Sequence, residues 1–119
     1  MTTTIKKVAQ YALFSDDIKL DLLVEDFLRS NPILADVQKP DKTDSRTLAV
    51  CASLLELFAL RSNQQPPTWT KEIGAIARPF FLQSDAMTSD WLRDLCISES
   101  PEPLRKRNLF ATSNFLLAV

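Results

Sequence analysis

Apolar residues recur at helical spacing along nearly the whole chain. Near the N-terminus, an i, i+3, i+4 pattern predicts a short amphipathic helix over residues 4–14. Ser15 can cap a second helix, which Pro32 ends because the residue before a proline avoids the helical region. The apolar stripe of this second helix consists of Leu20, Leu23, Val24, Phe27 and Leu28.

The most hydrophobic segment follows a polar loop at residues 36–44. Thr43 or Asp44 caps a helix that we expect to reach about Ser62, where Gln64-Gln65-Pro66-Pro67 ends it. Apolar side chains cover most of its faces, which predicts the central helix of a bundle. They are Leu48, Val50, Cys51, Leu54, Leu55, Leu57, Phe58 and Leu60, with Ala49, Ala52 and Ala59 between them.

Shorter elements are predicted in the second half of the chain. Thr68 or Thr70 caps a helix that passes through Ile76 and is broken at Pro79. Residues 80–82, Phe-Phe-Leu, follow as an apolar plug, and this is the one place where a short strand is an alternative.

Two more helix starts follow in the sequence. Ser89 and Asp90 begin a helix that carries Trp91, Leu92, Leu95 and Cys96 on one face. Ser100-Pro101-Glu102 supplies a capping hydroxyl, a proline at the first helical position and a carboxylate in the first turn. This helix carries the basic run Arg105-Lys106-Arg107, and a last helical turn is expected at residues 115–119. Together these elements predict an all-α fold, an irregular bundle of five to seven helices in a single helical domain over residues 1–119.

The amino-acid composition excludes several classes of catalytic and binding site. The chain has no histidine and one glycine, Gly74, which excludes histidine-dependent catalytic relays, the usual zinc sites and glycine-rich phosphate loops. Its 14 basic and 15 acidic residues give a net charge of -1, with no basic half that indicates a nucleic-acid partner. Cys51 and Cys96 each lie in an apolar helical pattern, which favours two buried free thiols. The N-terminus carries no secretory pattern, so we expect a cytoplasmic protein.

Acidic residues line one side of the second predicted helix. Asp17, Asp21 and Glu25 repeat at i, i+4, i+8, a spacing that places carboxylates one turn apart, as in metal-binding bundles. Here the row lies opposite the apolar stripe and lacks histidines, so we interpret it as a solvated face. We therefore expect no metal site and no cofactor.

The run Arg105-Lys106-Arg107, with Phe110 after it, is the strongest candidate for a binding segment. It can grip phosphate while the aromatic ring stacks on a base, or it can face a partner protein. Alternatively, Arg105 or Arg107 pairs with Asp90 or Asp94 within the fold.

The C-terminal segment, residues 108–119, contains six large apolar groups in twelve residues. Leaving them all in water is unfavourable at about 25 cal/mol per Å², so the segment lies in the core or in an interface, and we favour the interface. The predicted partner-binding residues are Arg105, Lys106, Arg107, Phe110, Phe115 and Leu116.

A resemblance also covers part of the second half. The order Pro67-x-Trp69, Arg78-Pro79-Phe80-Phe81-Leu82, Ser100-Pro101 and Arg107-Asn108-Leu109-Phe110 resembles a group of short uncharacterised bacterial helical proteins. Some of these are encoded beside nucleotidyltransferase-like or toxin–antitoxin partners. The resemblance assigns no catalytic residue and implies a partner-binding protein.

These observations favour a protein–protein interaction module over an enzyme. We expect an accessory or antitoxin-like subunit that binds a companion protein or a second copy of itself, rather than nucleic acid or a membrane. One alternative is a small helix-turn-helix regulator, for which only residues 105–108 resemble a recognition helix. The other is a histidine-free enzyme, which requires two carboxylates, or a carboxylate and a cation, in one cleft.

Overall fold

A computed structural model describes residues 3–14, 17–82, 89–113 and 115–116 of the chain. Within these ranges it contains five α-helices, two short 3-10 helices and one pair of two-residue strands. The all-α bundle predicted from the sequence is confirmed, and the strands are a minor addition to it.

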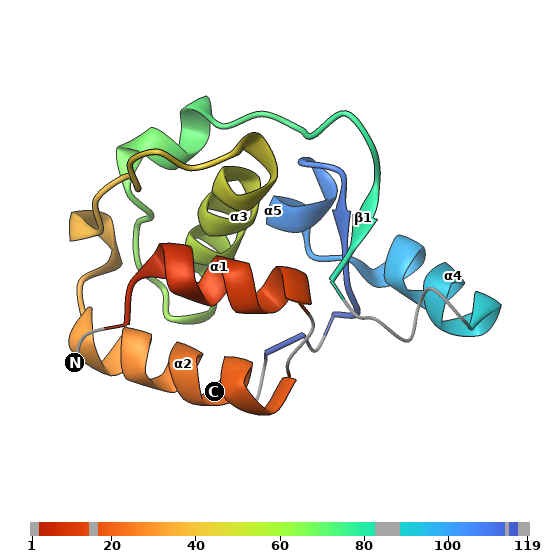
Figure 1. Cartoon of the computed structure of the whole chain (residues 1–119), viewed down its shortest axis with the longest axis horizontal. Helices are drawn as coiled ribbons and strands as arrows, with labels where there is room; N and C mark the ends of the chain where they lie inside the picture. Colours follow the sequence, from red (N-terminus) through yellow and green to blue (C-terminus); the bar gives the residue numbers. More distant parts are fainter. Residues whose placement is uncertain (1–2, 15–16, 83–88, 114, 117–119) are drawn as a thin grey trace.

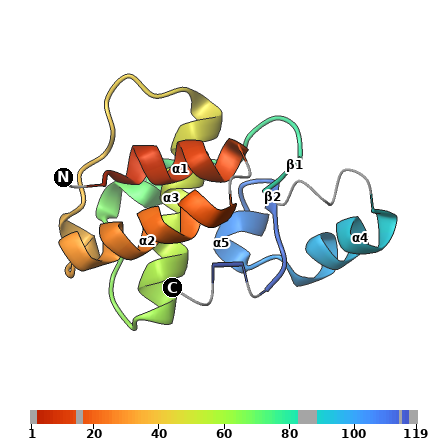
Figure 2. The same cartoon turned by 60° about the horizontal axis from the view of Figure 1, so that its bottom comes forward.

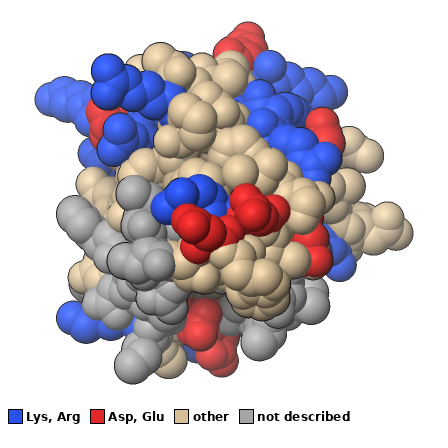
Figure 3. Space-filling view, turned by 90° about the vertical axis from the view of Figure 1, so that its right-hand side faces the viewer, with Lys and Arg blue, Asp and Glu red and all other residues tan. Residues whose placement is uncertain are grey.

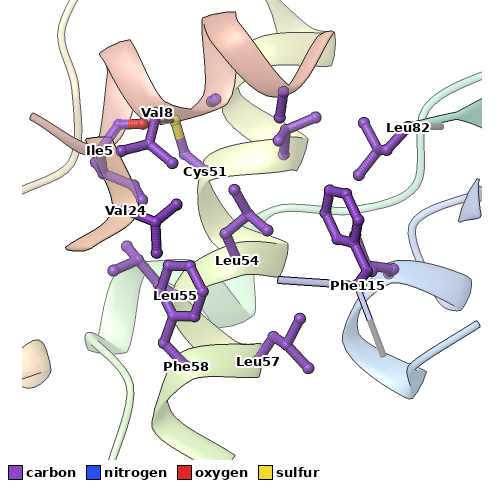
Figure 4. Close-up of a cluster of buried hydrophobic side chains, with 14 of the residues drawn as sticks. Ile5, Val8, Val24, Cys51, Leu54, Leu55, Leu57, Phe58, Leu82 and Phe115 are labelled. Atoms are coloured by element: carbon purple, nitrogen blue, oxygen red, sulfur yellow. Dashed lines mark hydrogen bonds between the residues drawn. The ribbon is translucent and has the colours of Figure 1, made fainter. Parts of the chain in front are cut away.

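The N-terminal half is a packed group of three helices (Figure 1). Helix α1 (Ile5–Phe14) contacts both α2 (Asp17–Ser30) and α3 (Ser45–Arg61). The core forms where their apolar stripes meet, with Val8, Val24 and Leu54 buried together (Figure 4). The prediction that helices occupy both N-terminal segments is confirmed, and the second helix ends before Pro32 as expected. Ser15 and its proposed cap lie outside the described residues.

Helix α3 is the centre of the molecule, as its composition predicts. Asp44 is its N-cap and accepts a hydrogen bond from the Thr47 backbone N–H at 3.1 Å. Every residue from Ala49 to Ala59 is buried, so α3 makes apolar contacts on all of its sides. Cys51 is buried against α1, where its Sγ donates to the Ile5 carbonyl at 3.7 Å (Figure 4). Both cysteines are buried and free, as expected.

The connection after α3 differs from the sequence prediction. In place of an α-helix through Ile76, the chain forms a 3-10 helix, η2 (Thr68–Glu72), and continues without helical structure to Pro79. Neither Thr68 nor Thr70 caps it, because the N-cap position is Pro67. The Ile76 N–H is instead bonded to the Arg107 carbonyl at 3.1 Å, which draws the segment toward the C-terminal part of the chain.

The apolar residues after Pro79 form a strand rather than only a plug. Strand β1 (Phe80–Phe81) pairs in parallel with β2 (Leu109–Phe110), with Phe80 opposite Leu109. The Phe81 and Phe110 rings lie 5.4 Å apart between centroids, which stabilises the pairing. Figures 1 and 2 show this small sheet on the far side of α3 from the 3-10 helix η1 (Leu34–Asp36).

The two C-terminal helices begin at the expected places but differ in detail. Ser89 caps α4 (Asp90–Glu99) by accepting from the Leu92 N–H at 3.2 Å, which confirms the predicted start. Helix α5 (Glu102–Arg105) is only four residues long, and Pro101 rather than Ser100 is its N-cap. The Ser100 hydroxyl donates instead to the Leu109 carbonyl at 3.1 Å, so it fastens β2.

None of the helices in the described part of the chain combines the length and the apolar run that a bilayer crossing requires.

Candidate functional site

A charged cluster lies between α3 and α5, in which Glu56 and Arg107 are buried and Lys106 is exposed; we call these three residues the Glu56 cluster. The Arg107 guanidinium meets the Glu56 carboxylate with two parallel hydrogen bonds, Nη1 to Oε1 at 3.0 Å and Nη2 to Oε2 at 2.8 Å. Lys106 Nζ lies 2.8 Å from Glu56 Oε1. Arg107 is only 1% exposed, so the fork–fork pair is shielded from water.

Arg107 uses all of its N–H groups. Besides the two bonds to Glu56, Nε donates to the Ile73 carbonyl at 3.0 Å, Nη1 to the Pro103 carbonyl at 3.0 Å and Nη2 to the Thr70 carbonyl at 2.7 Å. A guanidinium has five N–H donors, and here each has a partner. Arg107 therefore joins α3, η2, the segment after it and α5 through a single side chain.

The charge state of Glu56 follows from the same contacts. Burial alone raises the pKa of this carboxyl, but the hydrogen bonds from Arg107 and Lys106 outweigh burial and lower its pKa to about 2. Glu56 is therefore ionised across the physiological pH range and is a poor proton acceptor. The cluster meets the geometric condition for a histidine-free enzyme, a carboxylate and a cation in one place, but its groups are already saturated with each other.

A cavity of about 230 Å³ opens beside the cluster. Glu56 and Lys106 reach its lining, together with Lys71 from η2 and Glu102 from α5. A general base or nucleophile must have a reactive form and free access to substrate. The low pKa of Glu56 makes it a poor proton acceptor near neutral pH, and Arg107 has no N–H group left for a substrate. The pair of residues therefore supports a structural role.

The predicted partner-binding residues have separate environments. Arg107 and Phe115 are buried within the chain and present no surface to a partner, which corrects the expectation for both. Arg105 is exposed and donates to the Ser98 carbonyl at 3.0 Å. Lys106 is partly exposed beside Glu56, and Phe110 is half-buried in β2.

The described end of the C-terminal segment packs on the core. Phe115 belongs to the main hydrophobic cluster, and Leu116 packs against it (Figure 4). Leu109 is also buried, in β2. These residues therefore lie in the core and not in the interface that we favoured from the sequence. Residues 117–119 lie outside the described residues.

The structure also shows the surroundings of the acidic residues of α2 and the carboxylate partner of Arg107. Asp21 and Glu25 are exposed, as expected for a solvated face, and Glu25 pairs with Arg29 at 3.1 Å; the Asp17 side chain lies outside the description. Within the described residues, no three His, Cys, Asp or Glu side chains gather closely enough to hold a metal ion. The alternative in which Arg107 pairs with Asp90 or Asp94 is wrong, because its carboxylate partner is Glu56.

Sequence reasoning missed Glu56, although the sequence contains a signal for it. Between Arg46 and Arg61, Glu56 is the sole charged residue of an otherwise apolar helix. A carboxylate inside a central helix needs a cationic partner, because burying an unpaired charge is strongly unfavourable. That partner lies 51 positions away, too distant for any local pattern to identify.

Helix α4 presents a different kind of surface. It projects from the body in Figures 1 and 2, anchored by the buried Cys96 on its inner side. Its outer side carries Trp91, 72% exposed, and Ile97, 48% exposed. Asp94 lies between them in the helical repeat, and Asp90 flanks them. The sequence pattern placed Trp91 on one face with Leu92, Leu95 and Cys96, but the structure separates exposed Trp91 from buried Cys96.

No protein-family model, curated protein or solved structure matches the chain. The function must therefore be argued from the geometry of its own residues. Two regions contribute to that argument: the saturated Glu56 cluster and the exposed side of α4.

Proposed function

We propose that this protein is a protein–protein interaction module, an accessory or antitoxin-like subunit that binds a companion protein through the outer side of α4. The observation that carries the proposal is the exposure of Trp91 on a projecting helix. Scattered apolar residues are normal on protein surfaces, but an exposed tryptophan is unusual because it leaves a large apolar ring in water.

The surroundings of Trp91 support this assignment. Ile97 is a second exposed apolar residue of α4, six residues after Trp91 and therefore about 120° around the helix from it, with Asp94 between them. The exposed side of α4 therefore combines apolar and acidic side chains, and tryptophan is enriched among the residues that dominate the binding energy of interfaces. In Figure 3, which looks onto the side from which α4 projects, acidic side chains lie near the centre of the face next to a basic one, and on α4 Asp90 pairs with Arg93 at 3.4 Å. A partner surface that is apolar and basic would complement it.

The Glu56 cluster also supports the proposal, because it attaches the segment that follows α4 to the rest of the protein. Arg107 bonds to Glu56 on α3 and to the Pro103 carbonyl on α5, and Ser53 of α3 donates to the same carbonyl, so the segment that follows α4 is attached to the central helix. Because the C-terminal connection of α4 is attached in this way, less of the chain has to be ordered on binding, which lowers the entropic cost.

The test is co-purification of the tagged full-length chain from its native host, comparing Trp91→Ala with Leu22→Ala. Leu22 is a matched control because it is a similarly exposed apolar residue, 64%, on α2. We expect one stoichiometric companion, or a second copy detected by light scattering, with the unaltered chain and with Leu22→Ala. Trp91→Ala should reduce its recovery at least tenfold. Equal recovery with both variants would remove α4 from the interface.

A further inference from the structure

A second surface feature, independent of α4, lies where the first turn of α3 meets residues 75–78. The two segments enclose an open hollow of about 410 Å³, lined by Ser45, Arg46, Ala75, Ile76, Ala77 and Arg78. We call it the Arg46–Arg78 hollow. Two arginines from distant parts of the sequence thus line one concave surface, between the N-terminal helices and the small sheet.

Arg46 lies in the first turn of α3, and Arg78 lies in the exposed bend that leads into β1. The Arg46 guanidinium carbon lies 4.9 Å from the centroid of the Phe80 ring, a cation–π contact that orients this side chain. Phe80 is held in β1, where its N–H donates to the Asn108 carbonyl at 3.0 Å. Arg78 precedes β1 by two residues, and the neighbouring Ile76 N–H is bonded to the Arg107 carbonyl. The hollow is therefore bounded by the first turn of α3 and by a segment whose backbone is bonded to the C-terminal part of the chain at Ile76 and Phe80.

The charged side chains that line the hollow are all positive. Among the described residues that line it, two are arginines and none is acidic. The nearest carboxylate in the sequence, Asp44, is committed to Thr47, whose N–H and hydroxyl donate to its two oxygens at 3.1 and 2.6 Å. These hydrogen bonds lower the pKa of Asp44, so it stays ionised, while Thr47 occupies both of its oxygens. The hollow thus offers two guanidinium charges, and Ser45 adds a hydroxyl donor.

We propose that the Arg46–Arg78 hollow binds the phosphate monoester group of a small molecule. A guanidinium presents a planar fork of N–H donors that matches pairs of phosphate oxygens. A phosphate monoester has three free oxygens and close to two negative charges, so it can satisfy two forks at once, whereas a carboxylate has two oxygens and one charge. The apolar Ala75, Ile76 and Ala77 leave room for the rest of a small ligand.

The proposal is for a small ligand rather than nucleic acid. A nucleic-acid backbone is recognised by a series of cations along its path, and it shows steep salt dependence. The hollow is a single concave site with two arginines, while the chain as a whole carries a net charge of -1. This inference goes beyond the proposed function, because the hollow and the exposed side of α4 share no residue.

The test is a titration of the full-length protein with inorganic phosphate and with adenosine 5′-monophosphate at constant ionic strength, followed by backbone amide NMR shifts. We expect saturable shifts at residues 45–46 and 75–78 with both probes. Arg78→Ala should weaken binding at least fivefold, as should Arg46→Ala. Arg29→Ala removes an equal charge from α2 and should change affinity less than twofold. Circular dichroism of each variant verifies its fold, and the exposed Arg78 provides the cleaner test.

Other outcomes would overturn the proposal. An absence of saturable shifts, or equal weakening by Arg29→Ala, would mean that phosphate only screens surface charge. Tighter binding of a single-stranded oligonucleotide than of the monophosphate, with affinity falling steeply in salt, would identify a nucleic-acid surface instead. Neither result depends on Trp91, so it leaves the proposal for α4 unaffected.

Discussion

Arg107 and Glu56, 51 positions apart in the sequence, form a two-pronged ion pair at 3.0 and 2.8 Å inside the protein. Arg107 also donates to three backbone carbonyls, those of Thr70, Ile73 and Pro103. Arg107, which the sequence assigned to a partner interface, therefore holds separate elements of the fold together. The pair attaches the C-terminal segments to the central helix and leaves α4 as the projecting element.

Replacing Arg107 should destabilise the protein severely. Arg107→Met should lower the free energy of unfolding by about 3 kcal/mol or more, because Glu56 loses its buried partner and three carbonyls lose their donors. Urea unfolding followed by circular dichroism measures the change. The neighbouring Arg105→Ala is the control, and it should cost less than about 1 kcal/mol because Arg105 is exposed. A comparable loss for both variants would contradict the role assigned to Arg107.

The same ion pair predicts a pH dependence. The pKa of Glu56 is lowered from 4.5 to about 2 in the folded protein, so the unfolded state binds its proton first as the pH falls. The stabilisation is fully present above about pH 4.5 and is lost as the pH approaches 2, a difference of roughly 2–3 kcal/mol. Urea midpoints between pH 7 and pH 2.5 measure it. Glu56→Gln should remove this contribution, and an unchanged pH profile in that variant would contradict it.

The core of α3 gives a prediction about packing. Leu54→Ala or Phe58→Ala should each cost about 2–5 kcal/mol, since both side chains are buried and Phe58 also packs 6.5 Å from the Phe27 ring. Leu60→Ala is the control, because Leu60 lies on the same helix but is 67% exposed. Its cost should stay within about 0.5 kcal/mol. Thermal unfolding of the three variants distinguishes these outcomes.

The two tryptophans should differ in fluorescence. Trp69 is half-buried and its Nε1 donates to the Val37 carbonyl at 2.9 Å, whereas Trp91 is exposed on α4. A Trp69→Phe variant, which retains Trp91, should therefore emit at longer wavelength and be quenched strongly by acrylamide. The Trp91→Phe variant, which retains Trp69, should be protected. Equal quenching of the two variants would mean that α4 packs against the body.

Local signals account for most of the helical fold. The apolar character of α3, the Asp44 cap and the Ser89 cap are all properties of short windows, and each was predicted from the sequence. The pairing of β1 with β2 was not, because two-residue strands are too short to show an alternating pattern. Their parallel contact joins residues that are far apart in the chain, so it depends on the tertiary fold.

The site was harder to predict than the fold. A run of three basic residues usually lies on the surface, yet Arg107 is buried because Glu56 and three carbonyls replace its water. Trp91 shows the opposite case, since the helical pattern grouped it on one face with Cys96, which is buried. Its exposure follows from the orientation of α4, whose inner side is taken by Cys96, and only the tertiary structure determines that orientation.

The central claim is that Glu56 and Arg107 stabilise the fold through each other, and a double-mutant cycle tests it most directly. The free energy of unfolding is measured for the unaltered chain, Glu56→Gln, Arg107→Met and the double variant. We expect a coupling energy on the order of 2 kcal/mol, so that the double variant loses much less stability than the two single losses added together. Losses that add to within about 0.5 kcal/mol would show that the two residues act independently, and would contradict the account.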